Sequence, residues 1–155
     1  MLKLVRDNIP AIMFSKGQKP TIETVKGEIY LMELKKKLNE EVCEFIADPC
    51  VEEMADILEV LYVLAENFNF DAPVLKTEEK KERKELSELK KHLVEEKDKF
   101  IALASEKTFI KINNLLVELA NVMNIPLAKL ENVRQNKLKE RGGFKNGILL
   151  KVAKV

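Results

Sequence analysis

The sequence predicts an all-α protein, a bundle of about five helices built around an antiparallel hairpin, and three observations support this. Of the 155 residues, 46% are hydrophobic and 34% are charged, and the helix-favouring leucine, lysine and glutamate dominate. Glycine and proline number only five each, which is not typical of turn-rich β architectures. Apolar residues recur at spacings of three and four, and no stretch alternates for long enough to build a sheet.

The helices can be placed by this periodicity and by the residues that interrupt it. Residues 1–20 predict a short helix or an extended arm that ends in a loop. Longer helices are expected at about 27–47, 51–68, 76–99, 108–124 and 127–141. Asp48-Pro49 separates the first two because proline disfavours helix at the preceding residue. Gly142-Gly143 ends the last helix, and the tail from Phe144 onwards is expected to be a short extended segment.

The helix expected at 76–99 is unusually rich in charges of both signs. A narrow apolar stripe runs through it and just beyond, formed by Leu86, Leu89, Leu93, Phe100 and Leu103. This pattern predicts a long, largely exposed helix whose opposite charges pair along its surface, or a local coiled coil.

Composition also excludes several classes of function. The formal net charge is only +1, whereas proteins that bind DNA or RNA usually show a basic excess. No apolar run reaches the ~20 residues of a membrane helix, and the N-terminus lacks an apolar signal core, so we expect a cytoplasmic protein without a membrane partner. Cys43 and Cys50 are then expected to be reduced thiols. His92, the only histidine, lies in a charge run, which argues against a histidine base.

Carboxylates on the first hairpin are the most informative feature of the sequence. Glu41 and Glu44 on the first helix, and Glu53 and Asp56 on the second, are each spaced i, i+3 and so share a helix face. Both pairs are offset in the same sense from their apolar stripes, and both are symmetric about Asp48-Pro49. Antiparallel packing should therefore place Glu44 opposite Glu53, and Glu41 opposite Asp56.

Four carboxylates at one site require a cation. Two unit charges ~4 Å apart repel by about 4 kcal/mol at an effective dielectric constant of 20. Mg²⁺, with Mn²⁺ as an alternative, is a hard cation that accepts a few carboxylates and keeps positions for water or phosphate. Glu40 points further from the stripe, where it could support the metal ligands, act as a base for water, or be solvated. Alternatively, Lys36–Glu40 and Lys37–Glu41 form ordinary surface pairs.

Three stretches of the chain share motifs with a known superfamily. In residues 40–56, an E-E-x-x-E motif is followed by E-x-x-D on the predicted hairpin. Residues 3–10 read KLVRDNIP, close to a KLVRDKIP opening, and residues 137–144 read KLKERGGF, close to a K-x-x-E-R-G-G-F ending. In this order the motifs resemble the MazG-related all-α nucleoside triphosphate pyrophosphohydrolase superfamily, in its phosphoribosyl-ATP pyrophosphohydrolase-like branch.

The resemblance implies Mg²⁺-dependent cleavage between the α- and β-phosphates of a nucleotide, giving a monophosphate and pyrophosphate. By the family pattern, the metal ligands are Glu41, Glu44, Glu53 and Asp56, with Glu40 nearby. Four basic residues are candidates to bind phosphate oxygens: Lys3, Arg6, Lys137 and Arg141. Arginine suits this role because its guanidinium presents forked donors.

The similarity covers about residues 1–70 and 120–150 of a single domain spanning 1–155. Typical relatives have little between the E-x-x-D helix and the last helix, so residues 71–120 or thereabouts are expected to be an insertion. Such an insertion could lengthen the bundle, change the oligomer or cover the pocket. The long apolar stripes also predict a homodimer or a higher homo-oligomer, in which basic residues of a neighbouring subunit could reach the site.

Two classes of function follow. The first is an enzyme that removes non-standard or surplus nucleoside triphosphates, with phosphoribosyl-ATP as an alternative substrate. The second is a non-catalytic helical interaction module with a residual metal site, whose charged helix binds a partner. Four aromatic residues are candidates to stack on a base, although core packing is the better explanation for any one of them: Tyr30, Phe45, Tyr62 and Phe144.

Overall fold

The computed structural model describes residues 2–77 and 84–151. In this part of the chain, the elements in order are β1 (Leu2–Leu4), α1 (Ile9–Ser15), β2 (Ile22–Thr24), α2 (Gly27–Ala47), α3 (Val51–Phe68), α4 (Leu86–Ala102), α5 (Glu106–Val122), α6 (Leu127–Arg141) and β3 (Ile148–Lys151). The all-α prediction is confirmed, since the structure is 66% helical with only a small three-stranded sheet.

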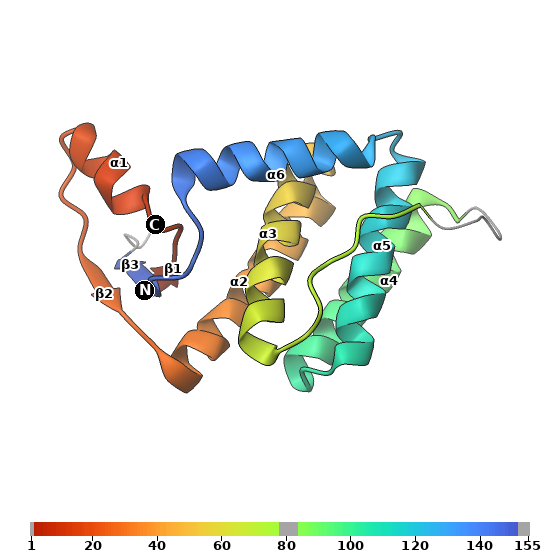
Figure 1. Cartoon of the computed structure of the whole chain (residues 1–155), viewed down its shortest axis with the longest axis horizontal. Helices are drawn as coiled ribbons and strands as arrows, with labels where there is room; N and C mark the ends of the chain where they lie inside the picture. The colour runs from red at the N-terminus through yellow and green to blue at the C-terminus, as the bar shows by residue number, and fades with distance from the viewer. Residues whose placement is uncertain (1, 78–83, 152–155) are drawn as a thin grey trace.

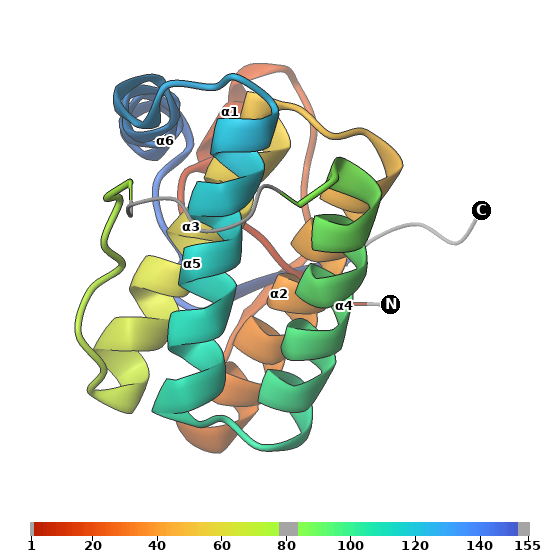
Figure 2. The same ribbon diagram turned by 90° about the vertical axis from the view of Figure 1, so that its right-hand side faces the viewer.

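The centre of the molecule is a bundle of α2, α3, α4 and α5. Helix α2 packs against α3 and α4, and α5 packs against α4 and α3. Figure 2 shows that α2 and α4 run in opposite directions, as do α3 and α5. Helix α6 crosses one end of the bundle and packs mainly against α3, while α1 and the sheet lie beside it (Figure 1).

The bounds of α2, α3 and α6 agree with the sequence-based placement. Residues at the helix ends account for this agreement. Asp48-Pro49 interrupts the helical conformation between α2 and α3, and Asn69 ends α3 in the left-handed conformation. The helix predicted at 76–99 was placed too early, because α4 covers Leu86–Ala102 and residues 76–77 and 84–85 are not helical. Residues 78–83 of that prediction lie outside the described part of the chain.

Helix α4 is less exposed than its charge predicts. Leu89, Leu93 and Phe100 are fully buried against the bundle, whereas Leu103 at the end of the stripe is 75% exposed. His92 lies within 4 Å of the exposed carboxylates of Glu88 and Glu95, in keeping with the solvated position expected for it. The apolar stripe of the charged helix therefore packs against α2 and α5 of the same chain.

The prediction that the chain builds no sheet was wrong. Strand β3 lies between β1 and β2 and pairs antiparallel with both, with Leu4 opposite Leu149 and Glu23 opposite Leu149. The strands contain only three or four residues, too few for alternation to be visible in the sequence. The sheet forms because the two ends of the chain meet beside α2.

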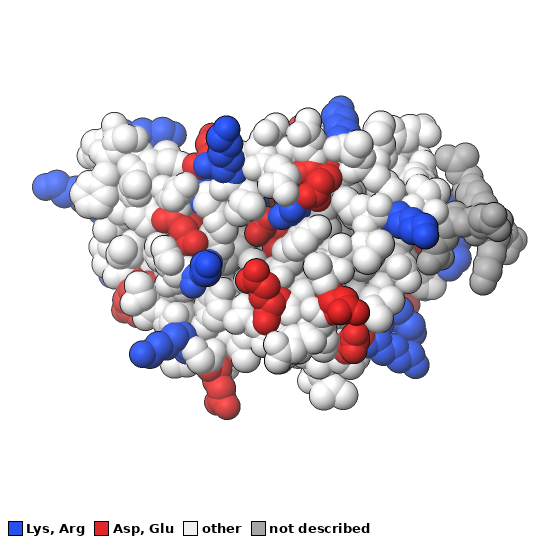
Figure 3. Space-filling view, viewed as in Figure 1, with Lys and Arg blue, Asp and Glu red and all other residues white. Residues whose placement is uncertain are grey.

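Two further findings concern the surface. Figure 3 shows acidic and basic side chains interspersed across the face it presents. No helix in the described residues is both long enough and apolar enough to cross a membrane.

Candidate functional site

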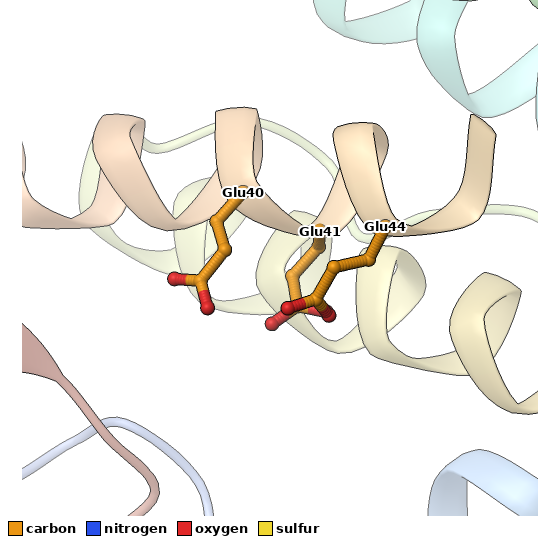
Figure 4. Close-up of side chains that lie close together, drawn as sticks. All are labelled: Glu40, Glu41 and Glu44. Atoms are coloured by element: carbon orange, nitrogen blue, oxygen red, sulfur yellow. The ribbon is translucent and has the colours of Figure 1, made fainter. Parts of the chain in front are cut away.

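The α2–α3 hairpin brings its carboxylates together on one flank. Oxygen atoms of Glu41, Glu53 and Asp56 lie within 4.8 Å of one another, and so do oxygen atoms of Glu40, Glu41 and Glu44. Figure 4 shows the three α2 carboxylates projecting from the same side of the helix, with those of Glu41 and Glu44 adjacent. Glu41 belongs to both groups and is the centre of the cluster.

Glu41 is the most unusual of these side chains. It is only 6% exposed, and its Oε2 has no hydrogen-bond partner among the described residues. Burial raises the pKa of Glu41 to about 8, and the negative charges of Asp56 and Glu44 add to this against the opposing effect of Lys37. A buried carboxylate with an unpaired oxygen is costly unless another group compensates its charge.

Glu53 shares this situation across the hairpin. Its Oε2 is also buried without a hydrogen-bond partner in the described part of the chain. Burial raises its pKa, and the nearby carboxylates of Glu44 and Asp56 raise it further. The cluster thus contains two oxygens, one from each helix, that no described residue pairs with.

Glu40 is held by two lysines instead. Lys3 from β1 forms an ion pair with one of its oxygens, and the Nζ of Lys37 lies 3.2 Å from the other. Burial alone would raise the pKa of Glu40, but the bonds to these lysines outweigh burial and lower it. Lys37 is itself 8% exposed and lies 3.4 Å from Glu41 Oε1, so it is an internal counter-ion rather than a surface lysine.

Asp56 is held by cations from both ends of the chain. Arg6 Nη2 donates to Asp56 Oδ1 at 3.0 Å, and Lys137 Nζ donates to both carboxylate oxygens at 3.0 Å. Lys137 also donates to the backbone carbonyl of Glu52 at 3.2 Å. Two of the predicted phosphate-binding residues therefore lie next to a predicted metal ligand.

The two terminal motifs meet at this point. The backbone N–H of Asp7 donates to the carbonyl of Gly143 at 2.7 Å, and Arg6 Nη1 donates to the carbonyl of Gly142 at 3.1 Å. Gly142 has φ +79°, and a Cβ atom there would lie 3.1 Å from the backbone nitrogen of Asn8. A side chain at Gly142 would thus be strained and crowded, and glycine permits the close approach that places Arg6 on Asp56.

Not every predicted residue lies at the site. The side chain of Arg141 is exposed and forms no ion pair with a described residue, although its backbone carbonyl accepts from Asn8. Phe45 and Phe144 are at most 2% exposed, and the cations of Arg6 and Lys37 lie 5.3 Å and 5.9 Å from the ring centre of Phe144. These two rings are packing residues of the described structure rather than exposed stacking surfaces.

The remaining aromatic candidates are already engaged. The Tyr30 hydroxyl donates to the carbonyl of Phe144 at 3.0 Å. The guanidinium of Arg134 lies 3.9 Å from the ring centre of Tyr62. Tyr30 and Tyr62 therefore each contact another residue of the described fold, the first through its hydroxyl and the second through its ring.

Sequence reasoning missed a buried ion pair beside the site. Arg134 Nη1 lies 2.8 Å from Glu59 Oε1, and the two residues are 5% and 4% exposed. Arg134 lies three residues before Lys137 on α6, and Glu59 three residues after Asp56 on α3, so the two ion pairs form successive steps between the helices. The common i, i+3 spacing could have suggested this second pair once the first was assumed.

The donor set fits a hard divalent cation. Glu41, Glu53 and Asp56 offer carboxylate oxygens at close range, with Glu44 beside them, and two of these oxygens lack partners within the described residues. Mg²⁺ prefers such oxygen ligands. A metal ion would also supply the charge that the buried Glu41 needs.

No family model, curated protein or solved structure matches this chain.

Proposed function

We propose that this protein is a Mg²⁺-dependent nucleotide pyrophosphohydrolase that cleaves nucleoside triphosphates between the α- and β-phosphates. The proposal is carried by two buried oxygens beside Asp56, one from Glu41 and one from Glu53, that have no hydrogen-bond partner among residues 2–77 and 84–151. Closely spaced carboxylates are stabilised by a bound cation. The basic residues around them would in turn bind an anion that is coordinated to this cation. A Mg²⁺–nucleotide complex meets both requirements, and the motifs of residues 3–10, 40–56 and 137–144 resemble a superfamily with this activity.

The residues divide into two sets. Glu41, Glu44, Glu53 and Asp56 would hold Mg²⁺, and Glu40 would support them through its bonds to Lys3 and Lys37. Bound there, Mg²⁺ would supply charge neutralisation and Lewis acidity toward the phosphates, and would lower the pKa of a bound water.

The second set holds the substrate. Lys3, Arg6 and Lys137 form a rim of positive charge around the carboxylates. We assign them to the phosphate oxygens, because Arg6 and Lys137 already donate to Asp56 and would lie next to a phosphate bound through the metal. In the reaction, a water oxygen bonds to the α-phosphorus, the bond from that phosphorus to the bridging oxygen breaks, and pyrophosphate leaves.

The experiment is a measurement of pyrophosphate release from standard and modified nucleoside triphosphates and from phosphoribosyl-ATP. It is run with and without Mg²⁺, on the wild type and on Glu41→Gln, Asp56→Asn and Glu118→Gln proteins checked for folding. Glu118 is an exposed carboxylate of α5 and serves as the control. We expect Mg²⁺-dependent release by the wild type and by Glu118→Gln, with a loss of at least about 100-fold in the two site variants.

The contradicting result is equally definite. A folded wild-type protein that binds Mg²⁺ but releases pyrophosphate from none of these nucleotides would exclude the enzyme. The carboxylates would then form a structural metal site in a helical interaction module.

A further inference from the structure

The α4–α5 hairpin repeats the sequence of the α2–α3 hairpin at a distance of 55 residues. When residues 31–47 are aligned with 86–102, eleven of the seventeen positions are identical. The identical pairs are Leu31/Leu86, Glu33/Glu88, Leu34/Leu89, Lys35/Lys90, Lys36/Lys91, Leu38/Leu93, Glu40/Glu95, Glu41/Glu96, Phe45/Phe100, Ile46/Ile101 and Ala47/Ala102. So high an agreement within one chain points to a second copy of the same helix.

The same offset continues through the second helix of each hairpin. Helices α2 and α4 end at Ala47 and Ala102, and α3 and α5 begin at Val51 and Glu106, so the turns between them have equal lengths. Asn69 and Asn124, again 55 residues apart, have φ angles of 57° and 58° just after α3 and α5. Identical residues are fewer here, namely Ile57/Ile112, Leu61/Leu116, Leu64/Leu119, Ala65/Ala120 and Asn69/Asn124.

Burial follows the repeat as well. Leu34, Leu38 and Phe45 are fully buried in α2, and their counterparts in α4, which include Leu89 and Phe100, are at most 1% exposed. Each hairpin therefore presents the same apolar stripe to the bundle.

One polar detail is also repeated. Glu96 is the counterpart of Glu41, and both carry a buried Oε2 that has no hydrogen-bond partner in the described part of the chain. The second hairpin thus keeps the central carboxylate of the cluster.

The other metal-ligand positions differ between the two copies. Lys99, Thr108 and Lys111 stand where the first hairpin has Glu44, Glu53 and Asp56. The Nζ atoms of Lys99 and Lys111 lie 3.3 Å and 3.9 Å from Glu96 Oε1. In the second hairpin, lysines therefore provide the positive charge that a metal ion would provide in the first.

The packing of the two copies resembles that of two subunits about a twofold axis. Helix α2 packs against its own counterpart α4, and α3 against its own counterpart α5. In both cases the helices run in opposite directions (Figure 2). A twofold interface between identical subunits produces such antiparallel packing of an element against its own copy wherever that element lies near the axis.

We infer that α4–α5 is a degenerate second copy of the carboxylate hairpin and takes the place of a partner subunit. One chain then forms by itself the four-helix core that would otherwise require one hairpin from each of two subunits. In this core, α2–α3 is the cation-binding hairpin, and lysines neutralise the carboxylate of α4–α5. This inference replaces the homo-oligomer expected from the sequence. The basic residues of the site, Lys3, Arg6 and Lys137, also come from the same chain as the carboxylates.

The first part of the test is sedimentation equilibrium of the full chain at micromolar concentrations. We expect a single species with the mass of one chain. A stable dimer would overturn the inference. This part does not depend on any activity.

The second part restores carboxylates to the degenerate copy, and it rests on the proposed function because it needs a working metal site in the first hairpin. The Lys99→Glu/Thr108→Glu/Lys111→Asp protein is titrated with Mn²⁺ and followed by the electron spin resonance of the free ion. A Lys99→Gln/Thr108→Gln/Lys111→Asn protein is the matched control.

We expect the number of bound Mn²⁺ ions per chain to double in the carboxylate variant and to stay at the wild-type value in the control. An unchanged number in a carboxylate variant with wild-type helicity would overturn the inference that the second hairpin keeps the geometry of the site. A wild-type protein that binds no Mn²⁺ would count against the proposed function alone, and sedimentation would then decide the inference. Sedimentation also decides it if the carboxylate variant fails to fold.

Discussion

The two hairpins of this bundle have the same framework and opposite chemistry. In both α2–α3 and α4–α5, leucines and a phenylalanine at the same spacing fill the core, and an asparagine in the left-handed conformation follows the second helix. On the flank, however, α2–α3 carries carboxylates where α4–α5 carries Lys99, Thr108 and Lys111. The comparison shows that the apolar stripe determines the packing, while three flank positions determine the charge of the site.

The two hairpins also differ in how they accommodate a carboxylate whose Oε2 atom is buried. In α4–α5, Glu96 lies close to two lysines of its own hairpin. In α2–α3, Glu41 has Lys37 on one oxygen, but four other carboxylates lie close to it, and burial raises its pKa to about 8. The first hairpin therefore stores an electrostatic cost that a cation would relieve.

The largest expected effect comes from breaking the ion pair between Arg134 of α6 and Glu59 of the first hairpin. Arg134→Met would leave Glu59 buried without its ion pair, and we expect this to lower the free energy of unfolding by about 3–5 kcal/mol. The counterpart of Glu59 is the exposed Asn114, and Asn114→Ala should change stability by less than about 0.5 kcal/mol. Urea denaturation measures both changes. A Glu59→Leu/Arg134→Met protein should regain much of the loss, and equal effects of the two single variants would contradict the comparison.

The next effect concerns the basic side chains that pair with the carboxylates of α2–α3, of which Lys137 is the example. Lys137→Met removes a charged donor to Asp56, and charge-assisted hydrogen bonds contribute about 1.5–3 kcal/mol. We expect kcat/KM for pyrophosphate release to fall by roughly 10- to 100-fold. Lys139→Met, two residues along the same helix on its exposed side, is the control and should retain wild-type kinetics. Equal losses in the two variants would remove Lys137 from the site.

A third prediction uses the pH dependence of the metal-free protein. Because the folded-state pKa of Glu41 is raised to about 8 from an ordinary value of 4.5, the unfolded chain loses this proton first as the pH rises. The contribution of Glu41 to stability therefore decreases between about pH 4.5 and pH 8, by at most about 1.4 kcal/mol per pH unit, and levels off above that range. In denaturation curves recorded with a chelator, Glu41→Gln should flatten this decrease. An unchanged slope in the variant would show that Glu41 does not titrate in this range.

The smallest expected effect is in the second hairpin. Lys99 and Lys111 are about half exposed or more, so their attraction to Glu96 is screened by water. Lys99→Gln and Lys111→Gln should each change the free energy of unfolding by about 0.5 kcal/mol or less, and pyrophosphate release should be unaffected. A large loss of activity in either variant, seen in the same kinetic assay, would mean that the second hairpin takes part in the reaction.

Features that depend on local spacing were predictable from the sequence. The bounds of α2 and α3 follow from the leucine periodicity and from Asp48-Pro49. The meeting of Glu41 with Asp56 follows from helical geometry and antiparallel packing alone. These inferences use only residues that are close in the chain.

Features that depend on distant segments were not predictable in the same way. The strands of the sheet are too short to show alternation, and they form only because both chain ends meet. The buried ion pair between Arg134 and Glu59 depends on where α6 crosses α3, and no local sequence pattern specifies this crossing point. The repeat of Leu31–Ala47 in Leu86–Ala102 is present in the sequence, but the many charges of α4 favour the interpretation of an exposed helix over that of a second copy.

The most direct test of the account compares the same substitution in the two copies. Glu41→Gln and Glu96→Gln remove one charge from equivalent positions of the two hairpins, and Mn²⁺ binding to each folded protein is measured by calorimetry. The account predicts that Glu41→Gln weakens Mn²⁺ binding by at least about tenfold, whereas Glu96→Gln leaves the affinity at the wild-type value. Equal affinities in the two variants would contradict the claim that the α2–α3 carboxylates are the cation site of this protein.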